Sequence, residues 1–400
     1  MSRRRRSELP EHRAIDAARG PGLERVLIVL NDLATGGAQR VAVSQAAWLA
    51  ADGYDVHVAS LERLPAGAMI AECRRLGVPT HLLRGRGEPE LLAAARLEAL
   101  VRGIRPDVVH THMAVAGVVG RGCARRHGVP HLVTTLHNLT DWQERAWHPL
   151  RFLDRKSLRW CDGIAAASEA IRAAMERWDA GLAARTRVVY NGVEVDSFAR
   201  DAGSRATARE SLGVEAAACV IGTVARLERR KGIDLLIGAF AAAHAAAPAL
   251  RLLVVGDGPE REALAACARE RGVERAVRFV GEQRDVRPWL AAMDVFAAPS
   301  RTEGLGIALI EAMAAGLPVL ASRVGGIPEV IGSCLCGELL PPEAGSAWRD
   351  AMLKLAADPG ARAALGATAS LRARAFSVEA SRDALCALYR EVLGRAAKAA

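Results

Sequence analysis

Residues 299–322 read PSRTEGLGIALIEAMAAGLPVLAS, and this stretch carries the clearest signals of fold and site in the sequence. A glycine-rich turn leads into an apolar run with helical spacing, and Gly-Leu-Pro then introduces a short strand-like segment. Glu303 and Glu311 stand eight residues apart. A helix that begins near Gly306 holds Glu311 and leaves Glu303 in the preceding loop, whose N–H groups can bind a phosphate or sugar oxygen. Because carboxylates accept hydrogen bonds from hydroxyls, the pair favours sugar handling over two unrelated glutamates.

Short strand-like runs alternate with longer amphipathic stretches on both sides of this segment. The runs are residues 25–30, 55–60, 106–112, 131–137, 162–168, 186–192, 219–225, 250–256, 276–281, 294–300, 317–322 and 337–340. Such alternation is typical of βα units on a parallel sheet. The sequence therefore predicts an α/β protein with two doubly wound parallel-sheet domains that face a cleft. Its ligand is expected at the carboxyl ends of the strands.

The series of βα units is interrupted at residues 197–216, which are polar and lack a strand. The predicted parts are a basic tail at 1–22, a first Rossmann-like domain at 23–200, a second at 201–375 and a C-terminal helix at 376–400. The tail has no apolar stretch behind its arginines, so we expect no secretory signal. It is expected either to be disordered or to contact anionic lipid.

The composition narrows the class of protein. The 400 residues carry a net charge of +9, with 51% hydrophobic and 25% charged residues, as in a folded chain of two or three domains. No uninterrupted apolar stretch reaches about 18 residues, so we expect no transmembrane helix. Eight cysteines without a CxxC pair suit buried thiols in a reducing cytoplasm. Aromatic residues are scarce and show no nucleic-acid-binding pattern.

Two further turns between a predicted strand and a predicted helix carry candidate site residues. The first contains Gly36 and Gly37, which let the backbone approach an anion at a helix start. The second places Arg226 and Lys231 five residues apart, where both side chains can converge on a diphosphate. An ordinary βα turn and a solvated basic loop remain the alternatives.

A third turn, VVGDGPERE at 254–262, begins at the end of a predicted strand and contains Gly256. It departs from the dinucleotide fingerprint because Arg261 stands at the third glycine position. An NAD-dependent dehydrogenase is therefore disfavoured, and the turn either faces a ligand or serves as a plain connection.

Three histidines fall on neighbouring strand-like runs. His137 ends one run, where it can donate a hydrogen bond to a sugar hydroxyl or a leaving phosphate, or serve a structural role. His110 and His112 stand two apart on another run and so share a face. No third ligand is evident beside them, and we predict no metal site.

Together these motifs resemble glycosyltransferase family 4 (the glycosyl transferases group 1 domain) of the GT-B fold, over about residues 23–395. The motifs are GGAQRV, NGVEVDSF, ARLERRKG, GDGPERE, FVGEQRDV and SRTEGLGIALIEAMAAGLPVLASRVGGIPEVI, in that order. The resemblance implies two Rossmann-like domains with C-terminal helices that cross back to the first. It also implies a nucleotide diphosphate sugar donor, held mainly on the second domain, and a retaining reaction without metal or cofactor.

The resemblance further implies roles for single residues. Arg226 and Lys231 would bind the diphosphate. Glu311 would hold the ribose, and Glu303 and His137 would face the transferred sugar. The implied catalytic residues are Glu303, His137, Arg226 and Lys231. The implied nucleotide-sugar-binding residues are Gly36, Gly37, Gly256, Gly281, Glu282, Gly304, Leu305, Gly306 and Glu311.

The chemistry is consistent with those roles. Departure of a nucleoside diphosphate builds negative charge, which fixed cations and N–H dipoles stabilise without a metal. The sugar becomes cation-like, as in glycoside hydrolysis. Front-side displacement and double displacement both remain open. Domain closure would exclude water as a competing acceptor.

The acceptor is expected on the first domain. Residues 138–160 mix arginines and a lysine with aromatic residues, as in a basic amphipathic helix that lies on an anionic membrane. An ordinary helix with a solvated basic face is the alternative. The resemblance implies a glycan, glycolipid or lipid-linked acceptor in cell-surface polysaccharide, lipopolysaccharide or glycolipid biosynthesis. Together with the cysteine pattern, this leads us to expect the enzyme in the cytoplasm, at the inner face of the membrane if the helix binds lipid.

Two other functions share this fold. A non-catalytic nucleotide-sugar-binding or scaffold protein is disfavoured because Arg226, Lys231, Glu303 and Glu311 are all present. A phosphorylase would need a pyridoxal lysine in the second domain and a much longer chain.

Overall fold

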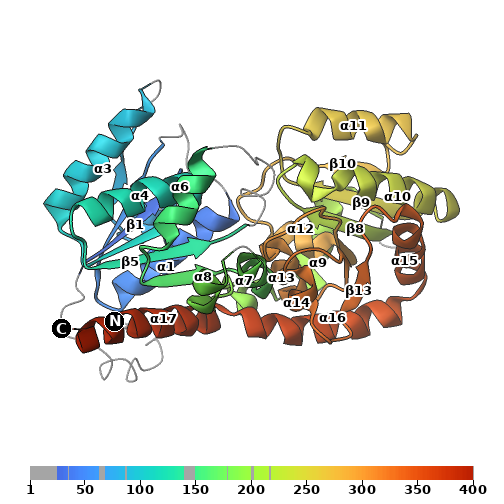
Figure 1. Ribbon diagram of the computed structural model, residues 1–400. Helices are drawn as coiled ribbons and strands as arrows, with labels where there is room; N and C mark the ends of the chain where they lie inside the picture. The colour runs from blue at the N-terminus through green and yellow to red at the C-terminus, as the bar shows by residue number, and fades with distance from the viewer. Residues whose placement is uncertain are drawn as a thin grey trace, which may run out of the picture.

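The computed structural model describes residues 25–34, 36–62, 68–85, 88–138, 149–177, 179–199, 202–215 and 218–399. Two parallel sheets, each flanked by helices, lie side by side (Figure 1). The predicted tail at 1–22 lies outside the described residues. The predicted division at 200/201 and 375/376 remains a proposal.

The first sheet has seven strands in the order β3-β2-β1-β4-β5-β6-β7, all paired in parallel. They are β1 (Arg25–Leu30), β2 (Asp55–Ser60), β3 (Thr80–Leu82), β4 (Val108–His112), β5 (His131–Leu136), β6 (Gly163–Ala166) and β7 (Thr186–Val188). Helices cover both faces of the sheet, so the residues of β1 from Val26 onward are fully buried and its sequence is a continuous apolar run. The strand predictions missed β3, a three-residue edge strand without such a run.

The helices of the first sheet pack in two layers. They are α1 (Gly37–Ala51), α2 (Ala68–Arg75), α3 (Glu90–Ile104), α4 (Ala114–Arg126), α6 (Pro149–Leu158), α7 (Glu169–Glu176) and α8 (Ala180–Ala184). Helix α1 packs with α17 (Val378–Ala399) over one face of β1, and α3 and α4 pack over the other face.

The second sheet has six parallel strands in the order β10-β9-β8-β11-β12-β13. They are β8 (Cys219–Val224), β9 (Leu250–Val255), β10 (Val277–Phe279), β11 (Val295–Ala298), β12 (Val319–Ser322) and β13 (Gly337–Leu340). Its helices are α9 (Ala202–Ser211), α10 (Ile233–Ala246), α11 (Arg261–Glu270), α12 (Arg287–Ala292), α13 (Ile307–Ala314), α14 (Ile327–Ile331), α15 (Gly345–Ala357) and α16 (Pro359–Ala373). In both sheets the strand order reverses beside the first strand, which is where open α/β sheets bind ligands.

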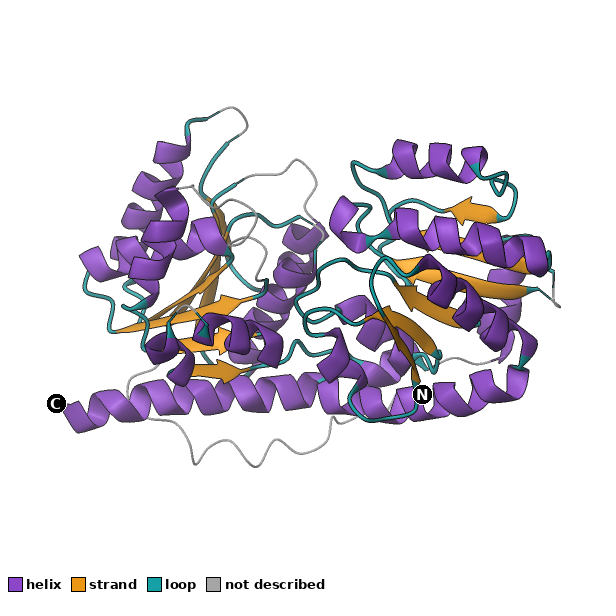
Figure 2. Ribbon diagram, turned by 45° about the vertical axis from the view of Figure 1, so that its right-hand side comes forward, coloured by secondary structure: helices purple, strands orange, loops and turns teal. Residues whose placement is uncertain are grey.

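The C-terminal helices cross from the second sheet to the first. Figures 1 and 2 show α16 along the second sheet and α17 along the first, at the same edge of the molecule. Leu385 and Leu388 of α17 are buried in the core of the first sheet, and Arg382 forms an ion pair with Asp52. This return of the chain confirms the prediction of helices that cross back. None of the helices in the described part of the chain is long and apolar enough to span a membrane.

Candidate active site

The candidate residues lie in loops and first helical turns beyond the carboxyl ends of strands, where the two domains contact each other. Lys231 follows β8, Glu303 follows β11, and Glu311 lies in α13 just beyond it. From the first sheet, Gly37 follows β1 and His137 follows β5. Because all strands of a parallel sheet end at one edge, residues distant in sequence come together there.

Lys231 and Glu303 form a largely buried ion pair. The Lys231 Nζ lies 2.5 Å from Oε2 of Glu303, and the two side chains are 18% and 12% exposed. Ser300 donates a further hydrogen bond to the same oxygen at 3.3 Å. Burial opposes ionisation of Glu303, but Lys231, together with Arg230 and Ser300, outweighs burial and lowers the pKa of that carboxyl. A fixed positive charge therefore stands beside a carboxylate at the end of β8.

Arg226 pairs with a neighbouring carboxylate, and its predicted convergence with Lys231 on a diphosphate stays a prediction. Its side chain is 64% exposed, and its Nε lies 2.9 Å from Oε1 of Glu228. Arg230 pairs with the other oxygen of Glu228 at 2.8 Å. Glu228, for which the sequence predicted no role, therefore holds the guanidinium groups of two arginines.

Glu311 pairs with a residue of α1, a helix that packs on the first sheet. Its buried carboxylate accepts a hydrogen bond from Nη1 of Arg40 at 2.6 Å, although the residues are 271 positions apart. Burial raises the pKa of Glu311, and the nearby Arg40 charge opposes that rise. Arg40 lies in the motif GGAQRV, but nothing in the sequence indicates its partner.

Two glycines let the loops of the two sheets touch. A Cβ on Gly304 would overlap the carbonyl oxygen of His137, and a Cβ on Gly37 would lie 3.1 Å from Cδ1 of Ile307. The two domains thus contact each other at the candidate residues. Gly36 precedes α1 in an extended conformation that any residue adopts, and a Cβ there would meet the side chain of Gln39.

The remaining glycine turns of the second sheet pack backbone against backbone. Gly256, at φ 128°, donates its N–H to the carbonyl of Gly281 at 2.8 Å, and a Cβ on Gly256 would overlap the carbonyl of Ala225. Glu282, which follows Gly281 in the chain, is exposed. This packing places the turns after β8, β9 and β10 together.

The loop that carries Glu303 is supported by two glycines the sequence analysis did not single out. A Cβ on Gly325 or Gly326 would overlap the carbonyl of Glu303 or Gly304, respectively. The adjacent Gly-Gly after the predicted strand 317–322 was the available signal. Two residues of the predicted set complete the loop: Leu305, which is buried in the core of the second sheet, and Gly306, which precedes α13 at φ 96°.

The imidazole of His137 contacts the imidazole of His112. The His137 Nε2 lies 2.9 Å from Nδ1 of His112, and His112 in turn stacks on His110 with ring centroids 4.4 Å apart. Burial lowers the pKa of His137 to about 4. Over the described part of the chain, no group of three or more His, Cys, Asp or Glu side chains is arranged to hold a metal ion.

Acidification from pH 7.5 to pH 5.0 is expected to destabilise the folded protein through these histidines. Burial, with a smaller contribution from the nearby His137, lowers the pKa of His110 to about 3. Burial lowers the pKa of His137 to about 4. A histidine with a lowered folded pKa contributes stability that is full above about pH 6.5 and is lost as pH falls. Protonation of each of these two histidines in the unfolded chain should lower the free energy of unfolding by about 2 kcal/mol at pH 5. Urea unfolding at both pH values measures the loss, and His110→Gln should reduce it. Equal stability at both pH values would contradict this expectation.

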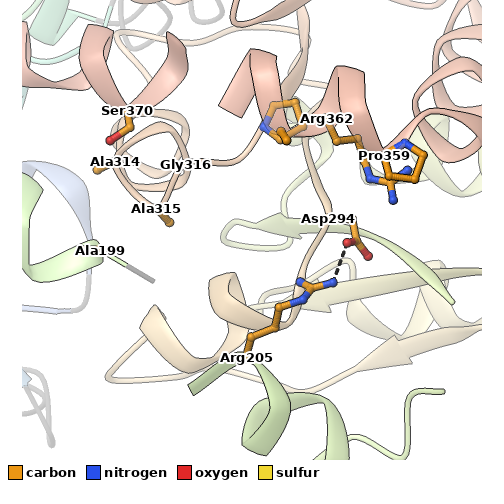
Figure 3. A pocket seen from close by; sticks show the side chains of 11 residues that line it. Ala199, Arg205, Asp294, Ala314, Ala315, Gly316, Pro359, Arg362 and Ser370 are labelled. Carbon is orange, nitrogen blue, oxygen red and sulfur yellow. Dashed lines mark hydrogen bonds and ion pairs between the residues drawn. The ribbon is translucent and has the colours of Figure 1, made fainter. Parts of the chain in front are cut away.

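A separate cavity of about 590 Å³ lies away from these residues. Figure 3 shows Arg205 paired with Asp294 on one side of it and Arg362 on another. The Arg362 Nη1 donates to the backbone carbonyl of Leu355 at 2.6 Å, and Arg205 donates to that of Met293 at 2.9 Å. The cavity lining contains none of the candidate site residues, and its arginines are already engaged.

Two facing parallel α/β sheets, with glycine-rich turns at the carboxyl ends of the strands and a C-terminal helix that returns to the first sheet, define the GT-B class of fold. The family model described as Glycosyltransferase Family 4 matches residues 35–197. The model described as Glycosyl transferases group 1 matches residues 218–358. The chain belongs to this family and is a glycosyltransferase.

Comparison with individual proteins agrees with the family. D-inositol 3-phosphate glycosyltransferase from Corynebacterium jeikeium is 33% identical over 334 residues, which cover 79% of this chain and 78% of that protein. Anabaena Alr3699/HepE, solved with UDP-glucose, superimposes with a TM-score of 0.80 at 24% identity and covers 91% of this chain and 98% of its own. WaaG, a glycosyltransferase involved in lipopolysaccharide biosynthesis, superimposes with a TM-score of 0.74 at 20% identity. The match covers 90% of this chain and 98% of WaaG.

Proposed function

We propose that the protein transfers a hexose-type sugar from a nucleotide diphosphate sugar to an acceptor hydroxyl. The observation that carries this proposal is the buried Lys231–Glu303 pair where the two sheets meet. It provides a fixed cation for a leaving diphosphate beside a carboxylate that can accept hydrogen bonds from the sugar. The UDP-glucose complex of HepE supports a donor of this class.

The donor would lie along the loops of the second sheet. The Glu311 carboxylate would accept hydrogen bonds from both ribose hydroxyls. The Arg40 guanidinium, which now donates to that carboxylate, would have to move away. The turn at Gly281 and Glu282 would meet the base. Arg226 is exposed and can swing from Glu228 toward the diphosphate.

The reaction would then proceed by departure of the nucleoside diphosphate. Lys231 and the N–H groups at the start of α13 would stabilise the developing charge, so the protein's own groups perform what a metal would do elsewhere. We propose retention by front-side attack, in which the leaving phosphate takes the acceptor proton. Closure of Gly304 against His137 would keep water from the cation-like sugar.

A donor screen tests this proposal. Purified protein is incubated with UDP-, GDP-, ADP- and dTDP-hexoses, with and without a panel of acceptors, and release of nucleoside diphosphate is measured. The expected result is acceptor-stimulated release from one nucleotide class. No release above the rate of an inactive Glu303→Ala variant with any donor and acceptor would overturn the proposal.

The acceptor is proposed to be a glycan, glycolipid or lipid-linked sugar of cell-surface polysaccharide, lipopolysaccharide or glycolipid assembly. The relative from C. jeikeium favours a second candidate, a small phosphorylated polyol such as inositol phosphate. Inositol phosphate therefore belongs in the acceptor panel, and stimulation by it alone would favour the second candidate.

The first sheet carries a surface suited to anionic lipid. Around α6, Phe152 and Leu153 are 60% and 48% exposed, and Trp160 is 40% exposed. The Lys156 ammonium lies 4.4 Å from the centre of the Phe152 ring, and the Arg125 guanidinium lies 5.7 Å from that of Trp160. Exposed apolar side chains with cations beside them are typical of surfaces that bind an anionic membrane peripherally. We propose that this α6 surface lies on the inner face of the membrane.

Replacing Phe152 and Leu153 together by serine is expected to weaken vesicle binding about tenfold or more, because their apolar area would no longer enter the lipid. Co-sedimentation with phosphatidylglycerol vesicles measures this. Leu91→Ser is the matched control, since Leu91 is 81% exposed on α3 and lies outside the α6 surface. Equal loss in both variants, or no binding by the unaltered protein, would contradict the membrane contact.

A further inference from the structure

We infer that His112 is a positioning residue, which fixes the tautomer of His137 so that His137 offers an Nδ1–H donor to the bound donor substrate. The inference rests on the proposed function for the identity of that substrate. It concerns a residue that never reaches the substrate itself, because His112 is fully buried.

The strand register brings the two imidazoles together. His112 ends β4 and pairs with Thr135 of the neighbouring β5, so His137, two residues further on, lies on the same face just beyond it. The two rings lie 5.2 Å apart at an interplanar angle of 22°, with Nδ1 of His112 2.9 Å from Nε2 of His137. The backbone carbonyl of His137 lies against Gly304, in a loop of the second sheet.

Both rings are neutral near pH 7. Burial lowers the pKa of His137 to about 4, and burial together with His110 and His137 lowers the pKa of His112 well below its usual value. A neutral imidazole carries one N–H and one bare nitrogen. The short contact therefore holds a single proton, and only two arrangements exist.

The two arrangements differ in where they leave an unpaired N–H. Neither Nε2 of His112 nor Nδ1 of His137 has a hydrogen-bond partner among the described residues. If His137 donates, the second proton of the pair sits on Nε2 of the fully buried His112. If His112 donates, that proton sits on Nδ1 of His137. Both nitrogens are buried in the structure, but His137 as a residue is only partly buried, whereas His112 is fully buried. Water or a ligand therefore reaches Nδ1 of His137 more readily than Nε2 of His112, and since a buried unpaired donor is costly, the second arrangement is favoured.

A second layer holds His112 in place. His110 stacks on it, and both nitrogens of His110 are engaged, Nδ1 with the Tyr389 hydroxyl at 3.0 Å and Nε2 with the Thr135 hydroxyl at 2.8 Å. Tyr389 belongs to α17, the helix that returns from the second sheet. The ring orientation at the candidate site is therefore anchored from three elements.

The consequence is chemical. With Nε2 occupied by the His112 proton and Nδ1 already protonated, neutral His137 has no free lone pair for use as a base. It donates a hydrogen bond to a hydroxyl of the transferred sugar or to an oxygen of the leaving phosphate. Acceptor deprotonation must then come from another group, as a front-side reaction provides.

Two substitutions at His112 separate positioning from packing. In His112→Asn the amide nitrogen occupies about the place of the imidazole Nδ1 and keeps an N–H donor, whereas His112→Leu fills the space without one. We expect kcat to fall about 10- to 100-fold in the leucine variant, with the donor KM nearly unchanged, and to be largely rescued in the asparagine variant. Urea unfolding of both variants checks that stability does not explain the difference.

Nitrogen NMR of ¹⁵N-histidine protein reads the tautomer without any turnover. We expect His137 to carry its proton on Nδ1 in the unaltered protein and in His112→Asn, and a mixture of tautomers in His112→Leu. A proton on Nε2 of His137 in the unaltered protein, or equal kcat in both variants, would overturn the inference. Failure of every donor in the turnover assay would instead count against the proposed function, because the NMR result does not depend on it.

Discussion

Replacing Lys231 by methionine is expected to lower kcat/KM for the donor about 10²- to 10³-fold. The ammonium would face the leaving diphosphate, and loss of one fixed donor of this kind to a developing negative charge has that magnitude in other enzymes. The methionine keeps most of the length of the side chain, so packing changes little. Initial rates of nucleoside diphosphate release, at several donor concentrations, measure the effect.

A double variant serves as the control for stability. Lys231→Met alone leaves the buried Glu303 carboxylate without its partner, which costs about 3–5 kcal/mol when such a pair is broken. Lys231→Met with Glu303→Gln removes both charges and should recover most of this stability while remaining inactive. Turnover near that of the unaltered protein in either variant would show that the pair is structural.

Replacing Gly304 by alanine is expected to lower kcat about 10²-fold while nucleoside diphosphate affinity stays within a few-fold. Gly304 has no left-handed φ, so alanine introduces no backbone strain there. Its Cβ would instead overlap the His137 carbonyl and push the two domains apart. A displacement of about 1 Å between reacting groups has an effect of this size. The nucleotide is proposed to bind mainly on the second domain, so its affinity should persist.

Gly103→Ala is the matched control. Gly103 lies within α3, and a Cβ there would meet nothing within 4 Å. Alanine should stabilise that helix by up to about 1 kcal/mol and leave kcat unchanged. If Gly304→Ala keeps full activity, the contact between Gly304 and His137 does not belong to the catalytic arrangement.

The sequence predicts the fold well because buried parallel strands leave a clear signal. The strand β1 is a continuous apolar run and was predicted with its observed bounds, whereas β3 has no such run because it is a short edge strand. The helix start at Gly306 was also predicted, since glycine takes the left-handed conformation that precedes α13.

The contacts between the two sheets were beyond sequence reasoning. Arg40 and Glu311 are 271 residues apart, and no periodicity links them. Arg226 pairs with Glu228, two residues further on, and the sequence offers no way to choose this carboxylate from the others nearby. The pairing of His112 with His137 is easier to predict, because His112 ends β4 and His137 directly follows the adjacent strand β5.

The central claim is that the loops of the second sheet bind a nucleotide diphosphate sugar through Lys231. The most direct test is a thermal-shift titration of the unaltered protein and the Lys231→Met variant with UDP, GDP, ADP, dTDP and NAD. A ligand at about 100 times its dissociation constant adds roughly 2.7 kcal/mol of stability, which a shift reveals. We predict that one nucleoside diphosphate stabilises the unaltered protein and that Lys231→Met loses most of this shift. Stabilisation by NAD alone, or an equal shift in the variant, would contradict the account.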